Sequence, residues 1–75
     1  MQVKARLYEM KIFGKNNTKK AIFLDADTMD KIDCLLSDEE YNALLPNKGK
    51  DGVLTVGLIK EEYAYKVKYK SFKVN

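Results

Sequence analysis

Tyrosine and lysine alternate along the segment 63–70, and this alternation constrains the fold more than any other feature of the chain. Successive side chains of a β-strand point to opposite faces of its sheet. One face of such a strand would carry Tyr63, Tyr65, Val67 and Tyr69, and the other would carry Lys66, Lys68 and Lys70. The pattern therefore predicts an amphipathic β-strand near the end of the chain.

This strand has two interpretations. Aromatic rings beside lysines suit an unpaired nucleic-acid strand, because bases stack on rings and phosphates pair with ammonium groups. The same alternation also describes a strand with one face in the core and the other in water. The pattern leaves both interpretations open.

The length and composition predict one small folded domain. A chain of 75 residues buries only about 60–65% of the surface that its unfolded form exposes. The hydrophobic fraction of 45%, with one proline and four glycines, supplies enough apolar groups to offset the entropy lost on folding. We expect a single domain over residues 1–75.

Cys34 is the single cysteine of the sequence. It cannot form an internal disulfide, which favours a reducing compartment. Its apolar neighbours in the run 32–36 predict a small buried hydrophobe, since no histidine is present to activate the thiol. The lack of histidine also excludes a serine or cysteine triad of the usual kind and a zinc site built on imidazole.

The sequence contains no motif for catalysis or metal binding. Aspartate pairs such as Asp25 with Asp27 could bind a divalent cation, yet nothing else in the sequence completes a coordination sphere and no glycine follows at the spacing of a calcium-binding loop. The segment Gly49–Gly52 lacks the spacing of a phosphate-binding loop. We therefore expect no enzyme activity, no cofactor and no metal. Residues 1–7 mix basic and apolar groups and do not form a signal or membrane segment, so we expect a cytoplasmic protein.

Charge is distributed unevenly along the chain. The net charge of +3 combines about +5 over residues 1–24, about −5 over residues 25–51 and about +3 over residues 52–75. A domain built this way would have a basic side made from its two ends and an acidic side made from its middle. Such a dipole orients a protein in the field of a polyanion.

The first half of the chain reads as three strands. Val3, Ala5 and Leu7 alternate over residues 2–13, and the apolar phase then moves by one residue to Met10 and Ile12. A phase shift of one residue predicts a β-bulge, which bends a strand so that it can serve two sheets or close a barrel. We expect a basic loop at 14–20, strands at 21–27 and 31–36, and a turn at 28–30 between these two strands.

A short helix and two strands follow. Ser37 and Glu40 match the capping box, and Pro46 would end the helix. Tyr41, Leu44 and Leu45 are expected to form its buried stripe. Residues 53–59 are apolar on both sides, which predicts the most interior strand. In the last strand, the alternation slips again after Tyr69, so that Phe72 and Val74 can rejoin the core.

The order strand, strand, strand, helix, strand, strand resembles the OB-fold, a mainly β, five-stranded Greek-key barrel with a helix between its third and fourth strands. The resemblance covers almost the whole chain, and it is one of layout. An SH3-like barrel, which also has five short strands, is the alternative. In OB-folds the ligand face comprises strands 2 and 3 and the loops joining strands 1–2 and 4–5.

This layout implies a nucleic-acid-binding site on the first strand, the basic loop and the last hairpin. Its candidate residues are Arg6, Tyr8, Lys11, Lys15, Asn16, Lys19, Lys20, Tyr63, Tyr65, Lys66, Lys68 and Lys70. The small size, strand order and lysine/tyrosine strand resemble the single-stranded-DNA-binding, helix-destabilising proteins of bacteriophages and mobile elements. That resemblance implies DNA or RNA binding without sequence preference, a role in DNA replication in the host cytoplasm, and a homodimer.

The aspartates of the second and third strands conflict with this interpretation, because a row of carboxylates repels phosphate. These residues are Asp25, Asp27, Asp30 and Asp33. They motivate a second hypothesis, in which the chain is a small phage-encoded inhibitor or adaptor. Its acidic middle, from Asp25 to Glu40, would imitate nucleic-acid phosphates toward a basic protein partner.

Overall fold

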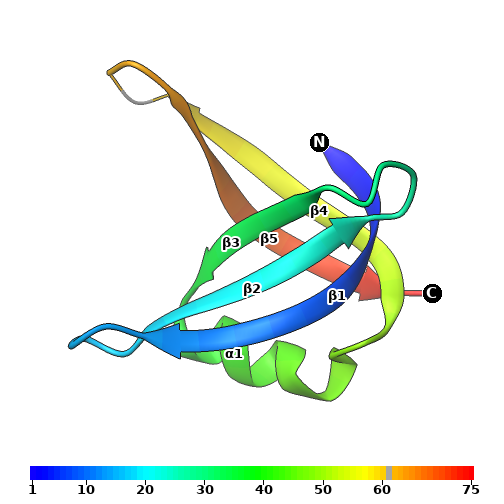
Figure 1. Cartoon of the computed structure of the whole chain (residues 1–75), viewed down its shortest axis with the longest axis horizontal. Coiled ribbons are helices and arrows are strands. Elements are labelled where there is room, and N and C mark those ends of the chain that lie inside the picture. Colours follow the sequence, from blue (N-terminus) through cyan, green and yellow to red (C-terminus); the bar gives the residue numbers. More distant parts are fainter. Residues whose placement is uncertain (61) are drawn as a thin grey trace.

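The structure is a computed structural model, and it describes residues 1–60 and 62–75. These residues form one antiparallel five-stranded sheet and one short helix (Figure 1). The strands are β1 (Gln2–Phe13), β2 (Thr18–Asp25), β3 (Lys31–Leu36), β4 (Asp51–Lys60) and β5 (Tyr65–Val74). The helix α1 (Asp38–Leu44) continues into the 3-10 turn η1 (Leu45–Asn47) and connects β3 to β4. The expected mainly β fold is confirmed.

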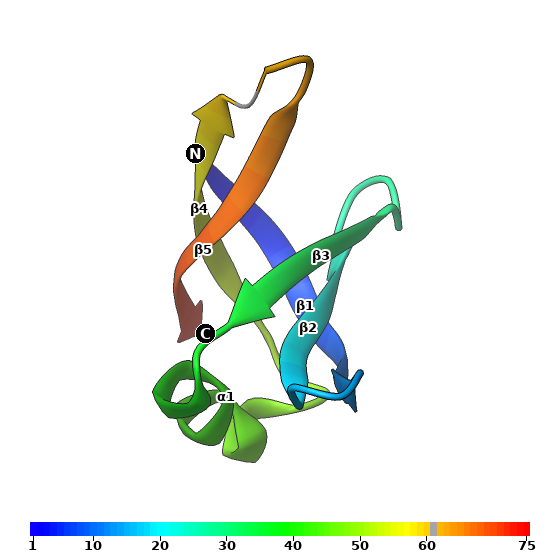
Figure 2. The ribbon, with the colours of Figure 1, turned by 90° about the vertical axis from the view of Figure 1, so that its left-hand side faces the viewer.

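The sheet is curled into a barrel-like shape. Its hydrogen-bonded order is β3-β2-β1-β4-β5, so β3 and β5 are the two edges. These edges approach each other on the side that Figure 2 shows. Over the described residues, β3 and β5 do not pair through backbone hydrogen bonds, so the barrel is not closed. Aromatic side chains pack across the core between β2 and β5, since the centre of the Phe23 ring lies 5.1 Å from that of Phe72 and 6.3 Å from that of Tyr69.

The predicted bulge in the first strand is confirmed. The pairing of β1 with β2 steps from Leu7 opposite Phe23 to Glu9 opposite Ile22, which leaves Tyr8 as the extra residue. Before the bulge, β1 also pairs with β4, over residues 2–6. The bulge bends β1 at the place where it passes from one pairing to the other. The central strand can therefore serve both halves of the barrel.

The phase slip in the last strand is also a bulge. The pairing of β4 with β5 steps from Thr55 opposite Ser71 to Val56 opposite Tyr69, so Lys70 is the extra residue. Tyr69 and Phe72 consequently both pack against the core. The prediction that the side chains after the slip rejoin the core is confirmed for Phe72.

The largest fully buried side chains are Phe23, Leu7, Leu54, Val56 and Cys34. The prediction that residues 53–59 form the most interior strand is wrong, because β2 has no exposed residue whereas the last three residues of β4 are exposed. Leu54 and Val56 of β4 are buried, whereas Leu58 and Ile59 are exposed. The apolar run extends beyond the barrel, so the apolar character of its last residues does not lead to burial. The bounds of β2 and β4 also differ from the expected 21–27 and 53–59, since β2 runs from Thr18 to Asp25 and β4 runs from Asp51 to Lys60.

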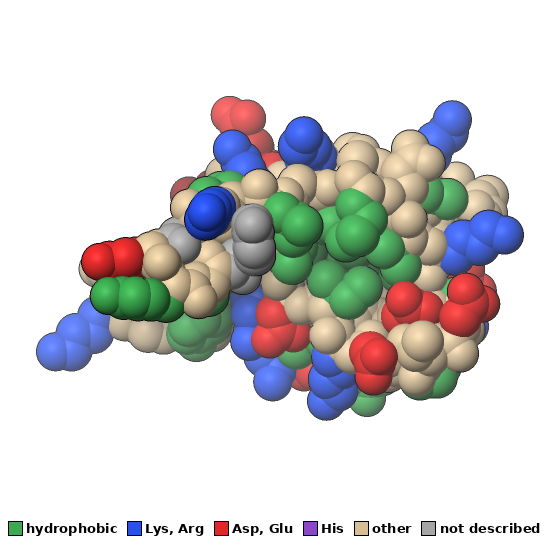
Figure 3. Space-filling view, turned by 90° about the horizontal axis from the view of Figure 1, so that it is seen from above, with side chains coloured by type: hydrophobic (Ala, Val, Ile, Leu, Met, Phe, Trp, Pro, Cys, Tyr) green, Lys and Arg blue, Asp and Glu red, His purple; other side chains and the backbone are tan. Residues whose placement is uncertain are grey.

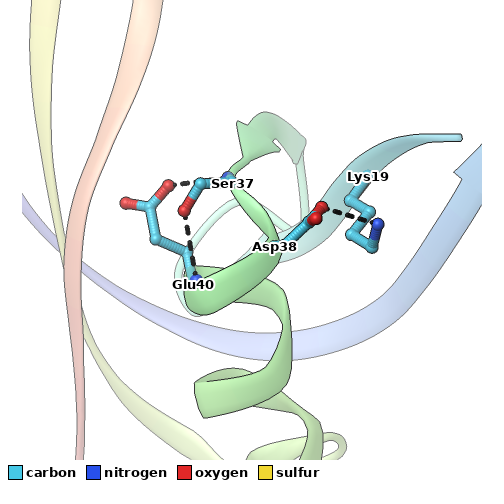
Figure 4. Close-up of polar contacts among 4 residues, drawn as sticks. All are labelled: Lys19, Ser37, Asp38 and Glu40. Carbon is cyan, nitrogen blue, oxygen red and sulfur yellow. Dashed lines mark hydrogen bonds and ion pairs between the residues drawn. The ribbon is translucent and has the colours of Figure 1, made fainter. Parts of the chain in front are cut away.

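Helix α1 begins with the predicted capping box (Figure 4). The Ser37 hydroxyl accepts from the backbone N–H of Glu40 at 3.2 Å, and the Glu40 carboxylate accepts from the backbone N–H of Ser37 at 2.9 Å. Leu44 packs into the core, as expected. Leu45 is exposed, contrary to the prediction, because the α-helix ends at Leu44 and the chain tightens into the 3-10 turn around Pro46.

We expect Leu54→Ala to lower the free energy of unfolding by about 2–4 kcal/mol, because it leaves a cavity among fully buried side chains. Urea denaturation followed by circular dichroism measures this change. Leu35→Ala is the matched control, because Leu35 is exposed on β3 and its truncation should cost much less. Equal losses for the two variants would show that the core lies elsewhere.

Candidate nucleic-acid interface

An aromatic and basic surface lies on the outside of β1 and β2. Met10 and Ala21 pair and pack into the core, so the next pair along, Lys11 and Lys20, faces outward. Phe13 lies two residues beyond Lys11 on the same face and is 48% exposed. Tyr8, pushed out of register by the bulge, is 49% exposed. We call the set Tyr8, Lys11, Phe13 and Lys20 the β1–β2 face.

The two lysines of the β1–β2 face form only weak interactions with other side chains of the protein. Lys20 Nζ lies 5.5 Å from the centre of the Phe13 ring and 3.3 Å from a carboxylate oxygen of Asp33. Lys11 Nζ lies 3.9 Å from a carboxylate oxygen of Glu9. Ion pairs at an exposed surface contribute little free energy. A phosphate can therefore compete for both ammonium groups.

The turn between β1 and β2 adds polar groups at one end of this face. Gly14 and Asn17 have φ angles of 77° and 53°, a left-handed conformation that glycine and asparagine tolerate well. Lys15 and Asn16 are exposed between them. The turn thus presents an ammonium group and an amide at the end of the face where Phe13 lies.

Lys19 and Arg6 have other surroundings. Lys19 has the opposite phase to Lys20 on β2, and its Nζ lies 2.7 Å from a carboxylate oxygen of Asp38 at the start of α1 (Figure 4). The same Nζ lies 6.0 Å from the centre of the Tyr41 ring. The contacts of Lys19 join β2 to the helix, so the structure places it away from the β1–β2 face.

Arg6 lies on β1 where this strand pairs with β4. Its Nε and Nη2 donate to the two carboxylate oxygens of Asp51 at 2.9 and 3.3 Å. This hydrogen-bonded pair raises the pKa of the Arg6 guanidinium and lowers the pKa of the Asp51 carboxyl. The carboxylate beside Arg6 makes this arginine a poorer phosphate ligand than Lys11 or Lys20.

The remaining candidates belong to the hairpin of β4 and β5. Its end projects from the barrel (Figure 1), and we call residues 58–60 and 62–67 the arm. Tyr63 is 93% exposed near its tip. Lys68 and Lys70 are exposed on the outer side of β5, where Gly57 leaves room for the Lys70 side chain to lie against β4. The side chains of Tyr65 and Lys66 lie outside the described parts of the structure.

The structure therefore divides the predicted site. Five candidates gather at the outside of β1 and β2 and their turn, and these are Tyr8, Lys11, Lys15, Asn16 and Lys20. Tyr63, Lys68 and Lys70 belong to the β4–β5 hairpin. Both hairpin turns project from the same side of the molecule, which Figure 2 shows face-on with β3 and β2 between them.

Phe13 is the residue that sequence reasoning missed. Its exposed ring lies next to Lys20, which makes it as good a stacking surface as Tyr8. The signal was present in the sequence. Once the bulge moves the inward phase to Met10, residues 11 and 13 must face outward.

The aspartates that conflicted with phosphate binding lie mostly elsewhere. Asp25 is the last residue of β2, and Asp27 and Asp30 follow in the turn to β3, at the opposite end of β2 from Lys15. The Asp25 carboxylate accepts from the backbone N–H groups of Asp27 and Thr28 at 2.8 and 3.1 Å, so it shapes this turn. Asp33 alone of the four lies beside the β1–β2 face, paired with Lys20.

A shallow cavity of about 320 Å³ lies between the β2–β3 turn and the start of β4. Its lining consists of Arg6, Leu24, Asp25, Ala26, Met29 and Asp51. The carboxylates of Asp25 and Asp51 would repel a phosphate there. Over residues 1–60 and 62–75, no three cysteine or carboxylate side chains are grouped as ligands for a metal ion.

Cys34 is buried in the core, as predicted. Burial raises the pKa of its thiol from 9.0 to about 11, with further contributions from the Asp33 and Glu40 carboxylates. Burial also raises the pKa of the Tyr69 hydroxyl, with the Glu40 carboxylate adding to the shift. At neutral pH the Cys34 thiol is therefore uncharged, and the side chain packs in the core as an apolar group.

We expect Cys34 of the folded protein to react with iodoacetamide at pH 8 at least about a hundredfold more slowly than a free cysteine, because the thiolate is the reacting form. Mass spectrometry of timed samples measures the rate. The same chain in 8 M urea is the control and should react at the rate of an exposed thiol. A rapid reaction of the folded protein would contradict the buried position.

Comparisons of the chain with protein-family models, with curated proteins and with solved structures found no match. Among the described residues, no helix is long and apolar enough to cross a membrane.

Proposed function

We propose that this protein binds single-stranded nucleic acid, above all single-stranded DNA, without sequence preference. The observation that carries the proposal is the β1–β2 face, where two exposed rings, Tyr8 and Phe13, flank Lys11 and Lys20 on one strand surface. Rings stack on any base and ammonium groups pair with any phosphate. A surface of this kind recognises the base rings and phosphates that all nucleotides share, and therefore binds an unpaired strand whatever its sequence.

The spacing of the face suits a strand that runs along β1. Tyr8 and Phe13 are five residues apart, and the bulge removes about one residue of rise, so their backbones are separated by about 13–16 Å. Lys11 lies between them in the sequence, and Lys20 lies opposite Lys11 on β2. Bases can stack at the two rings while the phosphates between them meet the two lysines. Lys15 and Asn16 extend the path past Phe13.

We further propose that the fold is an OB-like Greek-key barrel. The long bent β1 at the centre, the edges β3 and β5 side by side and the helix between β3 and β4 support this assignment. The β1–β2 and β4–β5 turns flank the outside of β2 and β3, as ligand-binding loops do in OB-folds. An SH3-like barrel fits less well, because it would usually lack a capped helix at this position. A role in phage or mobile-element DNA replication is the corresponding biological proposal.

The acidic middle gives less support to the alternative of an inhibitor or adaptor. Two of its carboxylates shape the backbone of the chain itself, because Asp25 accepts from N–H groups of the β2–β3 turn and Glu40 completes the capping box. A surface that imitates nucleic-acid phosphates needs carboxylates that are free to meet a partner. The structure offers fewer of these than the sequence suggested.

We expect Phe13→Leu and Tyr8→Leu each to weaken binding of a fluorescent dT oligonucleotide by about 5- to 150-fold, because each loses a stacking interaction of about 1–3 kcal/mol. Fluorescence anisotropy measures the dissociation constant. Leu45→Ala is the control, since Leu45 is an exposed apolar residue beyond α1. Unchanged affinity in both ring variants would contradict a stacking surface on β1.

We also expect binding to weaken steeply with salt, because each neutralised phosphate releases about 0.7 counterion. Lys11→Gln and Lys20→Gln should each reduce the slope of log K against log salt by about that amount. Lys48→Gln, at an exposed position after η1, should leave the slope unchanged. Equal reductions in all three variants would show that binding depends on overall charge and not on this face.

A further inference from the structure

A second basic surface lies on the outside of β1, β4 and β5, where β1 pairs with β4. Leu54 of β4 is fully buried, so the residues on either side of it along this strand point outward. The same alternation turns their pairing partners on β1 and β5 outward. Two rows of side chains result, and these are Lys4, Val53 and Lys73 in one row and Gln2, Thr55 and Ser71 in the other.

Two more lysines of β5 continue this surface toward the arm. Lys68 pairs with Gly57, and Lys70 is the extra residue of the bulge. The Lys70 Nζ lies 3.6 Å from the position that a Cβ of residue 57 would take, so the glycine lets this lysine reach across to β4. The four lysines are exposed. We call Gln2, Lys4, Thr55, Lys68, Lys70, Ser71 and Lys73 the β4–β5 face.

The lysines of the β4–β5 face stand without carboxylate partners. Over residues 1–60 and 62–75, the ion pairs involve other basic side chains and none of these four. The β1–β2 face differs, because Glu9 and Asp33 accompany its two lysines. Figure 3 shows basic side chains projecting from several sides of the molecule, so positive charge is not confined to one face. A phosphate that meets the β4–β5 face has no carboxylate to displace from these lysines.

The β4–β5 face also differs from the β1–β2 face in having no aromatic side chain among its residues. Its uncharged members, Gln2, Thr55 and Ser71, carry amide and hydroxyl groups that can donate to phosphate oxygens. An unpaired strand gains about 1–3 kcal/mol for each base that stacks on a ring. A duplex keeps its bases stacked inside and presents its phosphates outward. The chemistry of this face therefore fits the backbone of a duplex.

The dimensions of the β4–β5 face suit phosphates on the two sides of a groove. Lys4 and Lys73 lie on the strands that flank β4, so their backbones are about 10 Å apart. Lys68 and Lys73 are five residues apart along β5, or about 13–16 Å with the bulge. The minor groove of B-form DNA is about 6 Å wide. Lysines that extend from this face can therefore reach both strands of a duplex.

We propose that the β4–β5 face binds the phosphate backbone of duplex DNA and does not read its sequence. Phosphate contacts position a protein on a duplex but carry no sequence information directly. This contact does not rest on the proposed function, because the β4–β5 face shares no residue with the β1–β2 face. Lys4 lies on β1 four residues before Tyr8, so the two faces meet along this strand. One molecule could thus hold a duplex and the unpaired strand that leaves it.

Fluorescence anisotropy of a short blunt-ended DNA duplex, titrated with the full chain at several salt concentrations, tests the proposal. We expect a dissociation constant of about 1–100 µM at physiological salt, the usual range of binding without sequence preference. Lys4→Gln and Lys73→Gln should each reduce the slope of log K against log salt by about 0.9, because each phosphate contact releases that amount of counterion from a duplex. Lys48→Gln is the matched control at an exposed position after η1, and it should leave the slope unchanged.

The same variants, titrated with the dT oligonucleotide, separate this proposal from the proposed function. Lys4→Gln and Lys73→Gln should leave dT binding unchanged, whereas Tyr8→Leu should weaken dT binding and leave duplex binding unchanged. Circular dichroism confirms that every variant is folded. A wild-type chain that binds the dT oligonucleotide but no duplex overturns the duplex proposal alone. A chain that binds the duplex but not dT overturns the proposed function alone.

Three further results would also overturn the duplex proposal. The first is an equal loss of slope in Lys48→Gln, which would show a dependence on total charge. The second is loss of duplex binding in Tyr8→Leu, which would place the duplex on the β1–β2 face. The third concerns anionic membranes, which also attract clustered lysines. Cosedimentation with phosphatidylserine vesicles that Lys4→Gln and Lys73→Gln abolish, in a chain that does not bind the duplex, would assign the β4–β5 face to a lipid surface.

Discussion

The bulge at Tyr8 is the constraint on which the rest of the structure depends. It bends the central strand where its pairing with β4 gives way to its pairing with β2 alone, so one strand can hold both halves of the barrel together. The same extra residue resets the inward phase from Leu7 to Met10. The side chains that follow, Lys11 and Phe13, are thereby turned outward beside Tyr8. A single backbone irregularity thus closes the core and creates the candidate interface.

Neighbouring lysines show how the fold separates residues of the same type. Lys19 and Lys20 are adjacent in the sequence, yet Lys19 joins β2 to the start of α1 while Lys20 lies beside the Phe13 ring. Alternation along β2 sends the two side chains to opposite faces. What each ammonium group meets there depends on which element packs against that face. The basic character of the chain is therefore shared between structural and accessible lysines.

The two ends of the barrel are covered differently. The short helix α1 covers one end, whereas in Figures 1 and 2 no helix lies across the other. Leu58 and Val67 lie in the inward phase of β4 and β5 but extend past the layer that Val56 and Tyr69 complete.

Local patterns in the sequence determined the elements themselves. Hydrophobic patterns predicted the strands, the bulge in the first strand and the phase slip in the last, and Ser37 with Glu40 predicted the start of the helix, because these signals act between residues a few positions apart. Only the tertiary structure decided that β1 lies at the centre, that Leu45 is exposed and that the candidate site divides between the barrel wall and the hairpin. The apolar run from Val53 to Ile59 reads as interior throughout, yet its end passes beyond the barrel. Burial depends on which strands lie alongside a residue, and strand pairing joins segments too far apart in the chain for local patterns to specify.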